Sequence, residues 1–403
     1  MNGASVAAGS MTLDAPAMRG AGAAPLTVMM LISTHILGGP AKGLLQLIPE
    51  LQRRGRVRPL LCTFAQPGAV ETPFQAACRE QGVALHCFAQ AFNWDMRSFN
   101  TVREFVRREG VDIVQTHGYK ENICGLYLRR TAGKPWLTFV HGTTDENLKV
   151  RLYHALDRFI AARADRIVPV SHELMRRRVP KALRHKVRVV ENAIVPRARN
   201  VSPEAVAQWR ARHALTQPAV ACVGRLSPEK GQDVLLRAAA RLRDMGARFQ
   251  VALVGDGPWR AELEALAARL KLDAAVRFVG QQKDMDLVYA ATDLLVLPSR
   301  KEGMPNVVLE GMLAGLPIVA TQVGAVPDML TSGENGVLVP MGDDAALARA
   351  MRDVLCDGSF ARRIGERARA SLFPRFSIAQ RAQNVEDVYE ELTGEKLGLA
   401  AAP

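Results

Sequence analysis

Short apolar segments alternate with longer amphipathic segments through the first half of the chain. Uninterrupted apolar runs of about four to eight residues favour strands that are buried on both faces. In the first half, strands are predicted at residues 26–33, 58–64, 85–88, 113–116, 136–140, 166–170 and 187–191. An amphipathic helix is predicted from about Ala41 to Arg53, and helices fill the other gaps. Strands that alternate with helices of about ten or more residues indicate a parallel sheet.

The second half repeats this pattern. Its strands are predicted at residues 219–223, 250–254, 276–278, 294–297, 318–321 and 336–339. A chain of 403 residues is too long for one ordinary core and favours two domains of about 170 to 200 residues each. The junction is expected at Asn192 to Pro196, where the seventh strand ends. The predicted domains are therefore residues 25–195 and 196–375, both of the α/β class.

The first 24 residues are predicted to be a disordered tail. They are rich in Ala, Gly and Met, and they lack the basic start and continuous apolar centre of a signal peptide. No stretch of 18 uninterrupted apolar residues occurs in the chain, so a membrane span is not expected. Six cysteines without C-x-x-C spacing indicate neither a zinc site nor a disulfide framework. A reducing, cytoplasmic compartment fits best.

The net charge of +13 is concentrated in one half of the chain. Residues 25–195 contain 26 Lys or Arg against 14 Asp or Glu, whereas residues 196–403 contain 26 against 25. The excess is either a solvated surface or a surface that attracts an anionic membrane or an acidic acceptor. A nucleic-acid partner is not expected, because no aromatic platform or helix-turn-helix accompanies the charge.

The segment around Glu302 carries the most chemical information. It follows the strand at 294–297, and a Gly-Met-Pro turn then opens a helix. Pro305 suits the first turn of that helix, so the backbone N–H groups of Asn306 to Val308 are expected to be free and to favour an anion. Glu310 lies about one turn inside the helix and can accept two hydroxyls, as a ribose requires.

Two cations follow the first strand of the second half. Arg225 and Lys230 lie five residues apart around Ser-Pro, so both can face the mouth of the sheet and neutralise a diphosphate. Asp256 follows the next strand in a tight turn. It is either bonded to its own backbone or a metal ligand, and the turn interpretation is preferred.

Polar residues also follow strands in the first half. Gly39 lies between a strand and a helix, but the segment is not G-x-G-x-x-G, so a nicotinamide fingerprint is absent. His141 and His117 each end a strand. His141 is either a turn residue or a site residue, and His117 is a candidate for lining an acceptor site together with Lys120.

Three segments in this order and spacing resemble the retaining nucleotide-sugar glycosyltransferases of the GT-B architecture. More narrowly, they are similar to the family 4-like group that contains bacterial mannosyl-, galactosyl- and glucosyltransferases of lipopolysaccharide and capsule synthesis. The resemblance covers roughly residues 26–392 and is strongest in the second half. The segments are Val223–Gly231, Val254–Pro258 and Glu302–Thr321, and the weaker matches are Gly38-Gly39, His141-Gly142 and Val170-Ser171.

The resemblance implies two Rossmann-like domains that face each other across a cleft. The C-terminal domain would bind the donor and the N-terminal domain a variable acceptor, and a helix within residues 376–403 would cross back to the N-terminal domain. Its apolar face is expected at Phe376, Val385, Val388, Tyr389 and Leu392. The family often has Thr-x-x-Gly-Gly-x-x-Glu after the strand at 318–321, where this chain has Gly324-Ala325-Val326-Pro327-Asp328.

The resemblance also implies roles for individual residues. Glu302 would contact the donor sugar, Glu310 the ribose, and His141 the sugar from the opposite side. Arg225 and Lys230 would bind the diphosphate, and the Gly39 loop would close over it. The cradle for the sugar and phosphates would be Gly303, Met304, Pro305, Asn306 and Val307.

The implied reaction is transfer of a hexose, with retention, from a nucleotide diphosphate sugar to a hydroxyl of a glycan or lipid-linked acceptor. No cofactor and no metal are expected, and the enzyme is expected in the cytoplasm or at the inner face of the membrane. Two alternatives share the architecture: a nucleotide-sugar epimerase and an inactive binding subunit. A dinucleotide oxidoreductase is disfavoured by the missing glycine fingerprint.

Overall fold

The computed structural model describes most of the chain. The described residues are 17–18, 24–34, 37–66, 68–90, 95, 97–142, 148–196 and 201–397. The tail predicted over residues 1–24 lies outside this part of the chain, except for Ala17, Met18 and Ala24. None of the described helices combines the length and apolar character that a bilayer span requires.

The N-terminal domain contains a parallel sheet of six strands in the order β4-β3-β2-β5-β6-β7. The strands are β2 (Leu26–Leu31), β3 (Val57–Ala65), β4 (Leu85–Ala89), β5 (Ile113–Thr116), β6 (Trp136–Val140) and β7 (Arg166–Pro169). The helices are α1 (Gly39–Arg54), α2 (Pro73–Glu80), α3 (Arg97–Arg108), α4 (Tyr119–Thr131), α5 (Leu148–Ala161) and α6 (His172–Arg178), with the 3-10 helix η1 (Lys181–Lys186).

The C-terminal domain contains a second parallel sheet, in the order β10-β9-β8-β11-β12-β13. The strands are β8 (Ala219–Val223), β9 (Gln250–Val254), β10 (Val276–Gly280), β11 (Leu294–Leu297), β12 (Ile318–Thr321) and β13 (Val337–Val339). The helices are α7 (Pro203–Arg212), η2 (Pro228–Lys230), α8 (Gln232–Asp244), α9 (Arg260–Arg269), α10 (Met285–Ala290), α11 (Asn306–Ala314), α12 (Val326–Met329), α13 (Asp344–Cys356) and α14 (Gly358–Ala370).

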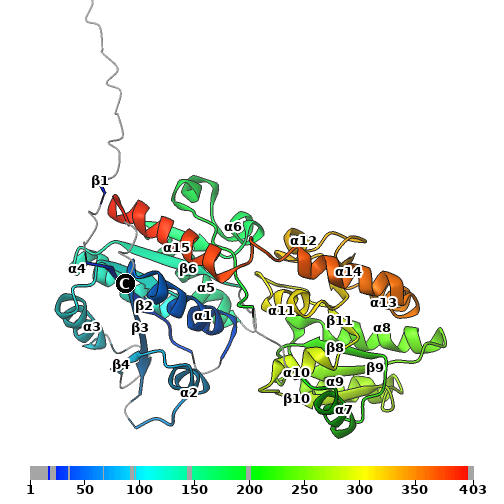
Figure 1. The fold of residues 1–403 in the computed structure, drawn as a ribbon. Coiled ribbons are helices and arrows are strands. Elements are labelled where there is room, and N and C mark those ends of the chain that lie inside the picture. Colours follow the sequence, from blue (N-terminus) through cyan, green and yellow to red (C-terminus); the bar gives the residue numbers. More distant parts are fainter. Residues whose placement is uncertain are drawn as a thin grey trace, which may run out of the picture.

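Both sheets have the same topology. In each domain the first strand lies near the middle of the sheet, the next two strands are added on one side of it, and the last three are added on the other side. This arrangement confirms the predicted two-domain α/β fold (Figure 1). Doubly wound sheets bind ligands beyond the carboxyl ends of their strands, at the point where the strand order reverses. In these sheets that point lies between β2 and β5 and between β8 and β11.

The chain crosses between the domains twice, and the two crossings lie side by side. Ile194 N donates to Phe376 O at 2.9 Å, and Arg375 forms an ion pair with Glu191 at 2.6 Å. After the second crossing, α15 (Ile378–Thr393) packs against α1 of the N-terminal domain (Figure 1). Helix α15 is followed by β14 (Glu395–Lys396), which pairs with β1 (Ala17–Met18).

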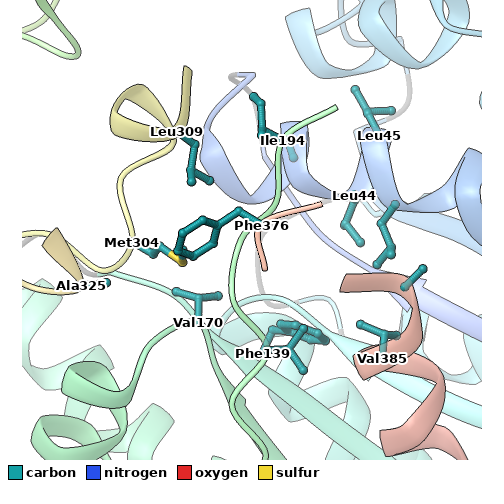
Figure 2. Packing of buried hydrophobic residues seen from close by; sticks show 14 of the residues in the cluster. Leu44, Leu45, Phe139, Val170, Ile194, Met304, Leu309, Ala325, Phe376 and Val385 are labelled. Atoms are coloured by element: carbon teal, nitrogen blue, oxygen red, sulfur yellow. The ribbon is translucent and has the colours of Figure 1, made fainter. Parts of the chain in front are cut away.

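One apolar cluster extends through both domains. Phe376 is 2% exposed, and it belongs to the same cluster as Met304 and Leu309 of the C-terminal domain and Val170 of the N-terminal domain. Figure 2 shows the Phe376 ring beside Met304, with Val170, Leu309 and Ile194 around them. The domains therefore share a core, which restricts their relative movement at this point.

A buried carboxylate attaches α15 to the N-terminal domain. The Glu386 side chain is fully buried and forms ion pairs with Arg54 at 2.7 Å and with Arg56 at 3.2 Å. At the exposed end of the helix, Glu391 pairs with Arg166 and Arg188. Several arginines of the basic N-terminal half are thus neutralised by acidic residues of α15.

One predicted strand does not form, whereas the predicted C-terminal helix does. Residues 187–191 form no strand, and Val187 makes only an isolated bridge with Ile167. Arg188 N and Val190 N donate to carbonyls of β7, but Pro169 has no N–H to return a bond, so the ladder stops. The C-terminal helix begins at Ile378, within the expected residues 376–403, because the Ser377 side chain caps it by accepting from Gln380 N.

We expect Glu386→Gln to loosen α15. The substitution leaves two largely buried guanidinium groups without their carboxylate, and removing one member of a buried pair costs about 3 kcal/mol or more. Hydrogen exchange of the α15 amides should therefore become faster. The neighbouring Asp387→Asn is the control, because Asp387 is exposed and, within the described part of the chain, accepts a side-chain hydrogen bond from Gln383 alone. Equal exchange in the two variants would contradict the prediction.

Candidate active site

The C-terminal domain contributes a buried carboxylate in the loop between β11 and α11. Glu302 is 7% exposed. Its Oε1 forms an ion pair with Lys230 Nζ at 2.8 Å and accepts from Ser299 Oγ at 2.7 Å. Burying a carboxylate is costly unless it is paired and hydrogen-bonded, and Lys230 and Ser299 provide both interactions. The fold thus brings together two residues that are 72 positions apart in the sequence.

The loop that carries the two predicted cations packs against the end of β11. A β-carbon at Gly231 would lie 2.1 Å from Pro298 O, so the end of this loop touches the segment before Glu302. Gln232 Nε2 donates to Arg225 O at 2.8 Å and holds the start of the loop. Arg225 is exposed, whereas Lys230 is half-buried. Both cations therefore follow β8 at the carboxyl edge of the sheet.

Helix α11 starts one residue later than the proline rule suggests. Pro305 is the N-cap residue, with extended backbone angles, and Asn306 is the first helical residue. Val308 N donates to Pro305 O at 3.1 Å, so the expectation of a free N–H at Val308 is wrong. One turn further along, Glu310 is half-buried and accepts a hydrogen bond from Tyr289 Oη.

The loops after β6 and β11 touch backbone to backbone. A β-carbon at Gly142 would lie 3.1 Å from Gly303 N, and a β-carbon at Gly303 would lie 3.0 Å from Gly142 N. Only glycine allows so close an approach without displacement. His141 and Glu302 directly precede these glycines, so the contact brings the two predicted site residues to the same boundary between the domains.

Further contacts hold the N-terminus of α11 against the N-terminal domain. Asn192 Nδ2 donates to Met304 O and to Asn306 Oδ1, both at 3.0 Å. A β-carbon at Gly39 would lie 3.7 Å from Asn306 Nδ2, which is an ordinary contact distance. Gly39, at the start of α1, thus lies beside the start of α11. Val307, the next residue of α11, is half-buried.

Two histidines follow the neighbouring strands β5 and β6. His117 Nδ1 lies 3.0 Å from His141 Nε2. Burial lowers the pKa of His141 to about 3, and the positive charge of Arg381 lowers it further. Burial also lowers the pKa of His117 well below its ordinary value, with contributions from His141 and Arg381. Both rings are therefore neutral at physiological pH.

The start of α4 places two further polar groups shortly after His117 in the chain. Lys120 Nζ donates to Gln90 Oε1, and burial lowers the pKa of Lys120. Glu121 is 3% exposed, and burial raises its pKa to about 7. These groups could receive hydroxyl or charged groups of a ligand that approaches the N-terminal domain.

Sequence reasoning interpreted the turn carboxylate correctly, but it missed three residues whose side chains contact candidate site residues. Asp256 Oδ1 accepts from Gly257 N at 2.8 Å, in agreement with the preferred turn interpretation. Ser299 was missed although it follows the end of β11, the position that marked the other site residues. Tyr289 and Asn192 carry no such signal, because their contacts with Glu310 and Met304 span 21 and 112 residues.

Two family models cover most of the chain. Residues 206–371 match the model described as glycosyl transferases group 1, and residues 37–198 match glycosyltransferase family 4. The 2-deoxystreptamine glucosyltransferase of Streptomyces kanamyceticus is 30% identical over 270 residues, which are 62% of this chain and 70% of that protein. The chain belongs to the family 4-like GT-B glycosyltransferases.

Other relatives support the same assignment. This GT-B glycosyltransferase is 35% identical over 179 residues to the lipopolysaccharide core biosynthesis glycosyltransferase LpsE of Rhizobium meliloti, a match that spans 44% of this chain and 50% of LpsE. Anabaena HepE, solved in complex with UDP-glucose, has a TM-score of 0.78 at 21% identity and covers 91% of this chain and 99% of its own. At that identity the likeness shows the fold alone.

The loop at residues 324–328, which departs from the family pattern, packs against the backbone of Glu302 and Gly303. Ala325 N donates to Gly303 O at 2.9 Å. Gly324 has a φ of +56°, and a β-carbon there would lie 2.5 Å from Glu302 O. The loop thus restrains the backbone of Glu302 and Gly303.

We expect Gly324→Ala to destabilise this GT-B glycosyltransferase more than Gly333→Ala. Both positions have positive φ, which costs a side chain about 1–2 kcal/mol. Gly333 has no heavy atom within 4 Å of an added β-carbon, whereas Gly324 would meet the Glu302 carbonyl at a further cost of about 1–3 kcal/mol. Thermal unfolding of the two variants measures the difference. Equal melting temperatures would mean that the loop yields without strain.

Proposed function

We propose that the protein is a retaining hexosyltransferase. It transfers a hexose from a nucleotide diphosphate sugar to a hydroxyl of a lipid-linked glycan in cell-surface polysaccharide synthesis. The observation that carries this proposal is the buried Glu302, held by Lys230 and Ser299 directly before the N-terminus of α11. Glu310 lies about one turn inside α11. A ligand that joins a sugar to a ribose through a diphosphate would meet Glu302 with its sugar and Glu310 with its ribose.

Each part of the donor has a chemical match in the C-terminal domain. Arg225 and Lys230 neutralise the diphosphate, together with the first turn of α11, where helix geometry favours negative charge. Glu310 accepts hydrogen bonds from the ribose hydroxyls. Glu302 accepts from hydroxyls of the hexose, and the Gly303–Val307 backbone lets the ligand approach closely. The complex of HepE with UDP-glucose supports a donor of this class.

The N-terminal domain completes the site. His141 contacts the sugar from the side opposite Glu302, since both flank the contact between Gly142 and Gly303. Gly39 lies beside Asn306, where the diphosphate would bind. His117 and Lys120 are close enough to the same edge to meet the acceptor.

The proposed mechanism is a front-face displacement. The bond between the anomeric carbon and the leaving phosphate oxygen breaks, and the acceptor oxygen forms a bond to the same face of that carbon. The acceptor proton passes to the leaving phosphate oxygen, so configuration is retained. Lys230 and Arg225 stabilise the charge that grows on the diphosphate, and positioning of the two substrates supplies the rest. A divalent metal is not required by this scheme.

We expect Lys230→Gln to weaken the binding of UDP or GDP about 10- to 100-fold, because one charge-assisted bond to the diphosphate is lost. Binding of the matching nucleoside should not change, since it has no phosphate. Titration calorimetry in excess EDTA measures the affinities for the nucleotide and for the nucleoside.

In the same EDTA buffer, the wild-type chain should transfer hexose, and NMR of the product should show the anomeric configuration of the donor.

Lys271→Gln provides the matched control for this experiment. Lys271 is exposed in the same domain but precedes β10, at the amino edge of the sheet. Its substitution should leave both affinities unchanged. Equal losses for nucleotide and nucleoside would remove Lys230 from the diphosphate site. An inverted product, or activity that returns only with Mg²⁺, would contradict the proposed reaction.

We further propose that the enzyme works at the cytoplasmic face of a membrane. The excess of basic residues in the N-terminal half attracts anionic lipids, at about 1 kcal/mol per basic residue near the surface. Apolar side chains lie among these charges on α5, where Leu156 is 46% and Phe159 62% exposed. The role of LpsE in lipopolysaccharide core biosynthesis supports an acceptor of the lipid-linked class.

We expect the full chain to sediment with anionic vesicles at low salt and to be released at high salt, because screening weakens attraction between separated charges. The double substitution of Leu156 and Phe159 by Asp should reduce sedimentation. Val70→Asp is the control, since Val70 is 88% exposed on the loop before α2. If the wild-type chain ignores anionic vesicles, the positive charge is only a solvated surface.

A further inference from the structure

A series of hydrogen bonds connects the C-terminal helix to His141. Tyr389 Oη donates to Gln115 Oε1 at 2.6 Å, and Gln115 Nε2 lies 2.7 Å from His117 Nε2. His117 Nδ1 in turn lies 3.0 Å from His141 Nε2. Tyr389 and Gln115 are fully buried, and His117 is 7% exposed. The series thus begins on α15, passes through β5 and ends beside the contact between the domains.

The chemistry of these groups gives the series a direction. The Tyr389 hydroxyl donates to the amide oxygen, which turns the amide nitrogen of Gln115 toward His117. An amide nitrogen can only donate, so His117 Nε2 must accept. A neutral imidazole carries one proton, which for His117 is then on Nδ1 and is donated to His141 Nε2. His141 is left with its own proton on Nδ1.

The surroundings keep both rings neutral, as this direction requires. Burial and the positive charge of Arg381 both disfavour the protonated rings. Arg381 is 3% exposed, and its Nε and Nη1 have no hydrogen-bond partner among the described residues. The charge of this guanidinium makes a positive charge on either imidazole costly.

We propose that Tyr389 and Gln115 are positioning residues that hold His141 in the tautomer with its proton on Nδ1. The ring then offers its ligand a hydrogen-bond donor, while Nε2 is occupied by His117. The role of His141 at the sugar rests on the function proposed above, but the direction of the series does not. The C-terminal helix would thereby determine which hydrogen bond the N-terminal domain makes to the sugar.

The tautomers can be observed directly by NMR of the full chain with ¹⁵N-labelled histidine. Protonated and unprotonated ring nitrogens have distinct shifts, and the His117→Gln and His141→Gln variants assign the signals. The wild-type chain should show both rings protonated on Nδ1. In Tyr389→Phe the amide loses its anchor and can rotate, so the population of the other tautomer of His141 should rise about 3- to 10-fold, as expected for the loss of one neutral hydrogen bond.

Two further variants separate this effect from a change in packing. Gln115→Met removes the donor to His117 at similar volume, and it should redistribute the tautomers as Tyr389→Phe does. Tyr127→Phe removes a comparable tyrosine-to-amide bond, to Asn100, outside the series and should change neither ring. Wild-type His141 protonated on Nε2, or unchanged tautomers in both series variants, would overturn the proposal.

Activity distinguishes this proposal from the proposed function. If the proton positions shift and hexose transfer falls about 3- to 10-fold in Tyr389→Phe, both stand. If the tautomers shift in a chain that never transfers hexose, the series is supported and the function fails. If transfer is normal in the wild type and the tautomers stay fixed in both variants, the positioning role alone fails.

Discussion

The backbone contact between Gly142 and Gly303 is the constraint on which the site depends. Each glycine directly follows a residue of the candidate site, so the distance between the two loops sets how far apart His141 and Glu302 are held. A side chain at either glycine would separate the loops or displace a backbone. The electrostatics on either side, a paired carboxylate and a neutral ring, matter only because this contact brings them together.

The apolar core that the two domains share stabilises the contact between Gly142 and Gly303. Phe376 lies in the second crossing, yet it packs with Met304 from the loop that follows Glu302 (Figure 2). The first crossing is hydrogen-bonded to the second through Ile194. Movement of one domain relative to the other must therefore disturb the segment that begins α11. The start of α11 and the two crossings are linked through Met304, which shares a cluster with Phe376, and through Asn192, which bonds Met304 and Asn306.

The sequence was sufficient for the sheets and for placing several candidate residues at their carboxyl edges. Buried parallel strands are continuous apolar runs, so segments such as 136–140 and 294–297 were predicted with the observed limits. Residues that follow such strands gather at one edge, which is why Glu302, Lys230 and His141 could be selected. The strand predicted at 187–191 does not form, because Pro169 of β7 has no N–H to continue the pairing.

Long-range side-chain contacts could not be predicted. Gln115 is one more residue of a buried strand, and Tyr389 one more apolar position on a helix. Their hydrogen bond joins positions 274 residues apart. The link depends on how α15 returns to the N-terminal domain, and no local pattern specifies that register.

The attachment of α15 has a consequence for any exchange of domains between this chain and a relative. Glu386 neutralises Arg54 and Arg56, and Tyr389 reaches Gln115, so the last helix is physically part of the N-terminal domain although it is encoded after the C-terminal one. A hybrid made by one cut near residue 196 would combine an N-terminal half with a foreign last helix. Recombination that keeps the N-terminal domain intact needs two cuts, one at each crossing, so that the C-terminal domain is exchanged as an insert.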